Sequence, residues 1–215
     1  MSKERFWDIA AASPLIALYA LATFGFALEL RQDLAQMAHP LRAGAAIVSH
    51  IASALFVAMQ IVLFLVRKPP VAKLSGAAPR VVAAAGSNTG LLYYFLQRAG
   101  SQWAIPSAIL IALGMAASTV ALLYLGRAFS ILPQARQLVT SGPYRIVRHP
   151  LYLAEQVSSF GVMLQFVQPW SALVFLFGVA LQWPRMIFEE RILAETFPEY
   201  RDYVARTWRI IPGIY

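Results

Sequence analysis

The sequence predicts an all-helical integral membrane protein, a bundle of about six membrane-spanning helices. Its composition is the first reason: hydrophobic residues fill 59% of the 215 positions and charged residues 13%. That charged share is about half of what an ordinary soluble domain carries. The second reason is a series of apolar runs that approach the roughly 20 residues a helix needs to cross hydrocarbon. The third is charge placement, because basic residues gather in the connectors between these runs.

The first two apolar runs are long enough to span a bilayer. Residues 9–28 follow a short charged lead and carry Pro14 in the first turns, where proline is tolerated. This run is longer than a signal-peptide core and lacks a small-residue cleavage site, so we interpret it as a span. The second span is expected over residues 43–66, after a connector of mixed charge that contains His39.

The third predicted span, residues 81–96, is the shortest and the least apolar. It follows a connector whose Pro-Pro and Ser-Gly pairs prevent helix continuation. Gly86 and Gly90 have the GxxxG spacing that lets helices approach closely, within the chain or between copies. A five-span alternative has residues 81–97 as a re-entrant or interfacial segment.

Three further spans are expected over residues 103–125, 151–167 and 170–188. Only Gln168-Pro169 separates the last two, so they should form a tight antiparallel hairpin. Two basic connectors without acidic residues, 67–80 and 126–149, should both face the cytoplasm. An even number of crossings must then lie between them. The pattern therefore predicts six spans in the cytoplasmic (inner) membrane, with both termini cytoplasmic.

The tail from Glu189 to Tyr215 is too polar to span. Apolar and aromatic residues recur in it at three- and four-residue steps: Leu193, Phe197, Tyr200, Val204 and Trp208. We expect a break at Phe197 and a second short helix that starts at Pro198. Such an amphipathic tail should lie along the membrane surface or cap the bundle. The chain would thus divide into four amino-terminal spans, 1–125, and a functional core, 126–215.

Several kinds of site are excluded or disfavoured by composition. The absence of cysteine excludes disulfides, thiolate metal ligands and a cysteine nucleophile. The three histidines are scattered, so we expect no metal or haem site, with His39 solvated and His50 packed between helices. No glycine-rich nucleotide loop is present, which excludes a dinucleotide or P-loop domain of the soluble type. The basic residues that give the net charge of +8 lie between apolar segments, so we expect them to contact the lipid bilayer and not nucleic acid.

The stretch GPYRIVRHPLYLAE, residues 142–155, predicts the polar end of a ligand site. On a helix that starts after His149, this residue, Tyr152 and Glu155 share one face. An acid one turn inside hydrocarbon costs on the order of 2–3 kcal/mol unless it is paired, so Glu155 indicates a ligand site. The plainer interpretation treats Arg145 and Arg148 as cytoplasmic anchors and Tyr152 as an interfacial aromatic.

A second polar group, RMIFEER, stands at the end of the last span. Arg185 and Glu189 are four residues apart, which by itself indicates an intrahelical ion pair. The short turn at 168–169, however, sets the last two spans side by side. It should therefore bring His149 and Glu189–Glu190 together in one pocket, where perturbed ionisation is expected.

Together these motifs resemble a known family. The order GPYRxxRHPxY, hairpin, RxxxEE and FPEYRDY, over roughly residues 126–215, is similar to the carboxyl half of the isoprenylcysteine carboxyl methyltransferases and their phospholipid methyltransferase relatives. The resemblance implies a membrane enzyme that binds S-adenosylmethionine without a Rossmann fold and releases S-adenosylhomocysteine. It implies a cofactor pocket lined by Leu138, Val139, Gly142, Pro143, Tyr144, His149 and Tyr152. From the local motif we add Arg148 and Glu155 as cofactor-binding candidates. It also implies that Arg185 and Glu190 are catalytic residues beside the methyl acceptor, and the adjacent carboxylate makes Glu189 a third candidate. Replacing Glu190 should lower turnover, and replacing His149 should weaken cofactor binding.

The chemistry of these residue types agrees with methyl transfer. A methyl sulfonium is already activated, so the enzyme mainly holds the acceptor in line and excludes water. Carboxylates can balance the sulfonium charge, tyrosine faces suit a soft cation, and an arginine can hold a carboxylate acceptor. The acceptor, a carboxylate, amine or thiol on a lipophilic molecule, should enter sideways from the bilayer.

Two alternatives stay open on the residues alone. RHPxYxxE, which includes Glu155, also resembles membrane sterol reductases, and that similarity implies NADPH and reduction of an isoprenoid or sterol-like lipid. A non-catalytic membrane protein on the same scaffold is the third hypothesis. Oligomeric state does not follow from the sequence.

Overall fold

The computed structural model describes residues 3–35 and 40–214, and it is almost entirely helical, which confirms the predicted fold class. Four helices are long and apolar enough to cross a membrane by length and composition. They are α1 (Lys3–Ala35), α2 (Pro40–Val66), α4 (Ala104–Leu125) and α6 (Trp170–Thr196). The helix α5 (Pro150–Met163) is shorter, and the third predicted span is divided into α3 (Ala77–Ser87) and the 3-10 helix η1 (Thr89–Phe95).

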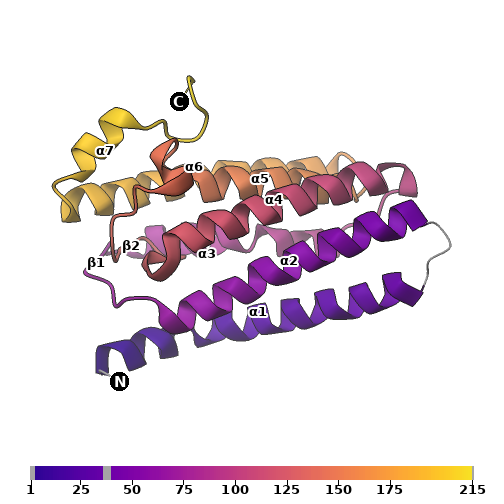
Figure 1. Cartoon of the computed structure of the whole chain (residues 1–215), viewed down its shortest axis with the longest axis horizontal. Coiled ribbons are helices and arrows are strands. Elements are labelled where there is room, and N and C mark those ends of the chain that lie inside the picture. The colour runs from indigo at the N-terminus through magenta and orange to yellow at the C-terminus, as the bar shows by residue number, and fades with distance from the viewer. Residues whose placement is uncertain (1–2, 36–39, 215) are drawn as a thin grey trace.

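The long helices lie along one axis; α1 and α2 run in opposite directions, and α2, α4 and α6 run the same way (Figure 1). α1 packs against α2, α2 against α4, α4 against α5, and α3 against α6. The predicted hairpin of α5 and α6 is present and the two helices touch, but α5 packs chiefly against α4. The short 3-10 helices η2 (Ser101–Trp103) and η3 (Gly126–Ala128) flank α4.

The two basic connectors lie at the same end of the bundle, as their charge pattern predicted. Strand β1 (Ala72–Lys73) pairs antiparallel with β2 (Gln134–Ala135), with Ala72 opposite Ala135. Ion pairs join α1 to these two connectors, because Asp8 of α1 lies 2.8 Å from Arg67 Nε and 2.9 Å from Arg136 Nη2. The side of the membrane that this end faces stays a prediction.

At the opposite end, His50 joins α2 to α1. Its Nδ1 lies 2.8 Å from Asp33 Oδ2, and its Nε2 lies 3.1 Å from Glu29 Oε2. His50 thus packs between helices as expected, but with two carboxylates that the sequence did not place near it. The predicted surroundings of His39 lie outside the described residues.

The interior is apolar, and much of the outside is apolar too. Phe64 and Leu122, which are 1% and 0% exposed, form a core with Phe129 between α1, α2 and α4. The outer surface carries exposed large side chains such as Leu21 and Phe24. An uncovered apolar surface of this extent is what a bilayer would cover.

The tail caps the end of the bundle that carries the connectors. α6 continues past the predicted end of its span, so it carries Glu189 and Glu190, and the chain breaks at Phe197 before α7 (Tyr200–Arg206). Beyond α7 the backbone pairs with the segment before α5: Trp208 N donates to Ile146 O at 3.1 Å, and His149 N to Arg209 O at 3.0 Å.

Candidate functional site

A cavity of about 340 Å³ opens where the connectors, the tail and the ends of α5 and α6 meet. Its volume lies within the range of small-molecule sites. Most of the predicted site residues line it: Leu138, Val139, Tyr144, Arg148, His149, Tyr152, Glu155, Arg185 and Glu189. The two polar motifs, which are far apart in the sequence, therefore face one space.

The start of α5 aims the RHPxY residues at this cavity. Pro150 is the first residue of α5, a position where its missing N–H has no intrahelical partner to lose. His149, Tyr152 and Glu155 then follow one helix face, as predicted, and all three line the cavity. The rings of His149 and Tyr152 stack, with centroids 5.4 Å apart and planes 9° from parallel.

The turn η4 (Gly142–Arg145) positions Tyr144. Gly142 has φ +59°, and a Cβ there would lie 2.3 Å from the ring of Tyr124, so only glycine fits. Tyr144 is buried and its carbonyl accepts a 2.7 Å hydrogen bond from the Tyr203 hydroxyl. Burial raises the pKa of Tyr203 to about 12, so this phenol stays a donor at physiological pH. Gly142 and Pro143 shape the turn and do not themselves line the cavity.

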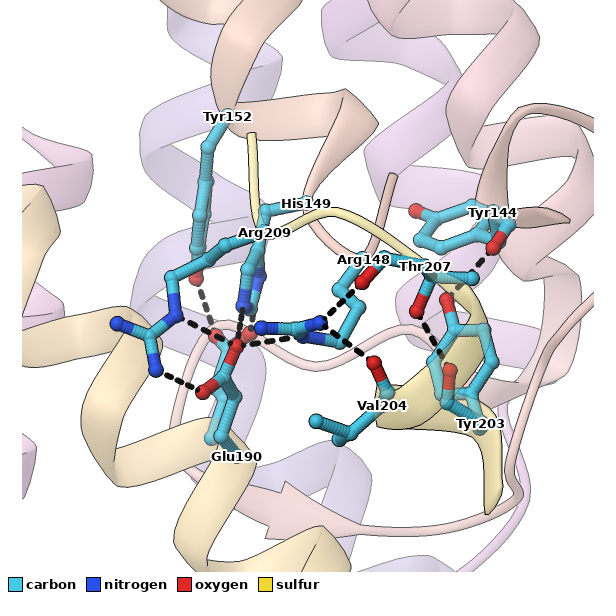
Figure 2. Close-up of polar contacts among 10 residues, drawn as sticks. Tyr144, Arg148, His149, Tyr152, Glu190, Tyr203, Val204, Thr207 and Arg209 are labelled. Atoms are coloured by element: carbon cyan, nitrogen blue, oxygen red, sulfur yellow. Dashed lines mark hydrogen bonds and ion pairs between the residues drawn. The ribbon is translucent and has the colours of Figure 1, made fainter. Parts of the chain in front are cut away.

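Glu190 is held by three basic side chains (Figure 2). Its Oε1 lies 3.0 Å from Arg148 Nε, 3.1 Å from His149 Nε2 and 3.0 Å from Arg209 Nε. Its Oε2 accepts from Arg209 Nη2 at 2.6 Å. Glu190 does not line the cavity, and it ties α6 to the RHPxY segment and to the tail.

Its neighbour Glu189 faces the cavity instead. Glu189 accepts a hydrogen bond from the Tyr152 hydroxyl, and its Oε2 lies 3.9 Å from His149 Nδ1. The His149 ring therefore lies between the two carboxylates, with one ring nitrogen toward each. Glu189 is directed toward Tyr152 and His149, in place of the ion pair with Arg185 that its helical spacing alone indicated.

Arg185 is a buried cation that lines the cavity. It is 5% exposed, and its guanidinium carbon lies 4.7 Å from the centre of the Tyr152 ring. Its Nε and Nη1 have no hydrogen-bond partner among the residues that the structure describes. Buried donors without partners are costly, so these two nitrogens mark a position where a ligand oxygen would be held.

Beyond Arg185 the cavity continues as an apolar arm between α3–η1, α5 and α6. We define the apolar arm by its lining residues: Gly86, Thr89, Gly90, Tyr93, Val162, Val174, Phe175 and Gly178. Tyr19, Phe56 and Gln60 add walls from α1 and α2. The amino-terminal spans thus contribute to the site, although the sequence pattern assigned it to residues 126–215.

Three important residues were not predicted from the sequence. Arg209 and Tyr203 bind Glu190 and Tyr144, and these contacts exist only once the tail has folded back. Gln182 donates to Glu155 Oε2 at 3.3 Å. A signal for Gln182 did exist, since an amide inside an apolar run, three residues before Arg185, indicates a polar partner within the membrane.

The chain is similar in sequence to several known proteins. Residues 99–200 match the model of the phospholipid methyltransferase family. The nickel-cobalt-cadmium resistance protein NccN of Alcaligenes xylosoxydans xylosoxydans is 34% identical over 113 residues, covering 50% of this chain and 52% of that protein. The cobalt-zinc-cadmium resistance protein CzcN of Cupriavidus metallidurans is 36% identical over 117 residues, covering 52% of each. The chain therefore spans about half the length of the curated relatives it matches.

A solved structure matches the whole arrangement. The eukaryotic intramembrane Ras methyltransferase ICMT (isoprenylcysteine carboxyl methyltransferase) superposes with a TM-score of 0.53 and 19% sequence identity. The match covers 95% of this chain and 85% of that one. At this identity the likeness shows a shared fold and leaves the substrate undetermined.

Proposed function

We propose, from the match of residues 99–200 to the phospholipid methyltransferase family, that this chain transfers a methyl group from S-adenosylmethionine to a lipophilic acceptor. The resemblance read from the motifs is confirmed by that family match and by the shared fold. The observation that carries the proposal is the single cavity that both motifs line. It joins a polar end beside the connectors to the apolar arm between α3–η1, α5 and α6.

The polar end has the chemistry that the cofactor requires. Glu189 lines the cavity wall beside the His149 ring, so its carboxylate can balance the charge of a bound sulfonium. The residues proposed to hold the cofactor are Leu138, Val139, Tyr144, His149 and Tyr152. When bound, S-adenosylmethionine supplies an activated methyl group. The protein then has to align the acceptor and exclude water, which the buried Tyr144 and Tyr152 favour.

The acceptor side centres on Arg185 and Glu189. In this proposal Nε and Nη1 of Arg185, which lack partners among the described residues, donate hydrogen bonds to an oxygen of the acceptor. Glu189 balances the charge of the acceptor group or takes its proton. Glu190, whose oxygens bind Arg148, His149 and Arg209, acts as a positioning residue in this proposal. The apolar arm receives the lipophilic part of the acceptor, which reaches it from the bilayer.

Ligand-dependent melting temperatures test the cofactor. Purified protein in detergent is heated with S-adenosylmethionine, S-adenosylhomocysteine or NADPH, because a ligand that binds only the folded state raises the melting temperature. Stabilisation by the two methionine-derived ligands supports the proposal. Stabilisation by NADPH alone would instead favour a lipid reductase, and no response to any of them would favour a non-catalytic protein.

Methyl labelling tests the reaction and identifies the acceptor. The protein is incubated with methyl-labelled cofactor and an extract of native lipids, and the labelled product is located after separation. A labelled lipophilic carboxylate, amine or thiol that depends on the wild-type protein supports the proposal. Absence of label, in a preparation that binds the cofactor, would count against methyl transfer to a lipid.

A further inference from the structure

Gly86 and Gly90, which have the GxxxG spacing, lie in different surroundings. A Cβ built on Gly86 would lie 2.7 Å from Cδ of Arg185, 3.4 Å from its Nη1 and 3.6 Å from its Nε. A Cβ on Gly90 would meet nothing within 4 Å. In this chain the spacing is therefore not a pair of equivalent helix contacts. Only Gly86 makes a close approach, and its neighbour is the buried arginine of the cavity.

Arg185 lies close against α3 and is enclosed on another side by Tyr152. It is 5% exposed, and the ring of Tyr152 contacts its guanidinium at 4.7 Å. An approach of 2.7 Å between carbons that are not bonded is far inside the usual contact distance, so a side chain at position 86 must displace the Arg185 stem. The nitrogens nearest to Gly86, Nη1 and Nε, are the two without hydrogen-bond partners among the described residues.

We propose that Gly86 is a positioning residue for Arg185: the missing side chain lets α3 close on α6 while the arginine stays folded into the cavity with its Nε and Nη1 free for a ligand. Gly86 thereby sets where the polar group of the acceptor is held, at the entrance of the apolar arm. The functional part of this inference rests on the proposed methyl transfer. The structural part does not, and the two can be tested separately.

A double-mutant cycle on the melting temperature tests the structural part. Gly86→Ala should lower the melting temperature by roughly 2–4 °C in the wild-type background. In the Arg185→Ala background the same change should be neutral or stabilising, because the collision is gone and alanine is the better helix former. Gly44→Ala on α2, where a Cβ meets nothing within 4 Å, is the matched control and should not lower it in either background.

Every outcome of the cycle either supports or overturns the proposed contact between Gly86 and Arg185. If Gly86→Ala does not fold but the double variant does, the rescue supports the collision with Arg185. An equal loss in both backgrounds, or failure of both variants to fold, overturns it. Should Arg185→Ala alone fail to fold, the cycle is run on Arg185→Ser, whose side chain likewise ends before Cδ.

Kinetics test the functional part. In Gly86→Ala, the rate of methyl transfer to the native lipid extract should fall roughly ten- to a hundredfold, because a misplaced binding group upsets alignment. Affinity for S-adenosylhomocysteine should stay within about twofold of wild type, since cofactor residues are unchanged. Loss of both together would indicate general damage and overturn the positioning role. If no preparation transfers methyl groups but the thermal cycle behaves as expected, the proposed function fails while the contact between Gly86 and Arg185 stands.

Discussion

Two adjacent carboxylates on α6, Glu189 and Glu190, have different neighbours although the sequence makes them look equivalent. Glu190 is held by Arg148, His149 and Arg209. Glu189 accepts from the Tyr152 hydroxyl and lines the cavity. Successive helical positions point about 100° apart, which lets the two carboxylates reach different neighbours. The pair thus combines a contact that holds the tail with a group available to the ligand.

Glutamine substitutions separate these two roles. Glu190→Gln should reduce the free energy of unfolding by about 2–3 kcal/mol, because it removes the negative charge that three basic side chains share. Glu189→Gln should change stability by less than about 1 kcal/mol and lower turnover. Thermal unfolding and initial rates on both variants check this. A more stable Glu190→Gln, or full turnover in Glu189→Gln, would contradict the assignment.

The hydroxyl of Tyr203 supplies a second test at this scale. Tyr203→Phe removes the donor to the buried Tyr144 carbonyl and should cost about 1–2 kcal/mol of stability, with weaker cofactor binding. Tyr94→Phe is the control, because Tyr94 is 84% exposed and should tolerate the change. Equal melting temperatures for the two variants would show that the Tyr203 contact does not hold the turn at Tyr144.

At the scale of elements, close packing of α4 on α5 fixes the direction of the RHPxY helix. A Cβ on Gly114 of α4 would lie 2.5 Å from the Ser158 nitrogen and 2.8 Å from the Ala154 carbonyl oxygen of α5. Backbone is the obstacle here, and backbone cannot rotate aside as a side chain can. The separation of these helices therefore depends on a small residue at position 114.

Gly114→Ala should push α5 away from α4. We expect a loss of about 1–3 kcal/mol in stability and weaker cofactor binding, because Tyr152 is carried on the displaced helix. Gly25→Ala on α1 is the control, since a Cβ there meets nothing within 4 Å. Circular dichroism melts and cofactor titrations check both. Unchanged melting and binding in Gly114→Ala would refute the role given to this contact.

Element boundaries could be predicted where hydropathy alone decides them. The runs 43–66 and 103–125 correspond closely to α2 and α4. The region 81–96 could not be resolved, because its break between α3 and η1 serves packing against α6 and leaves no hydropathy signal. The helix break at Phe197 was predicted from the helical spacing of the apolar residues in the tail, and α6 does end at Thr196.

The residues of the candidate site were predictable only where a local motif carries them. His149, Tyr152 and Glu155 follow from helical spacing, and Arg185 and Glu189 follow from the hairpin that returns the chain. The partners Arg209 and Tyr203 come from the tail, and Gly86 comes from another helix. Contacts at such sequence separations have no periodic signature, so they became visible only in three dimensions.

At the scale of the whole molecule, a buried ion cluster ties α1 to the connectors that border the site. Asp8 bonds to both Arg67 and Arg136, whose side chains are 7% and 0% exposed. These partners stand 59 and 128 residues from Asp8 in the sequence. Arg136 and its neighbour Gln134 also line the cavity, so the cluster connects the amino-terminal helix to the cavity wall.

Asp8→Asn should therefore destabilise the chain strongly. The change leaves two buried arginines without their counter-charge, and we expect a loss of about 3 kcal/mol or more. Asp202→Asn on the exposed face of α7 is the control and should stay within about 0.5 kcal/mol of wild type. Chemical unfolding of both variants in one detergent measures the difference. A loss for Asp8→Asn no larger than that of the control would refute the link.

The RHPxY segment and the end of α6 should together enclose one ligand. Hydrogen–deuterium exchange of the wild-type protein, with and without S-adenosylhomocysteine, measures this. Exchange should slow on binding in both residues 138–155 and residues 185–209. Slower exchange in only one of these segments, or in neither while the ligand is bound elsewhere, would contradict it.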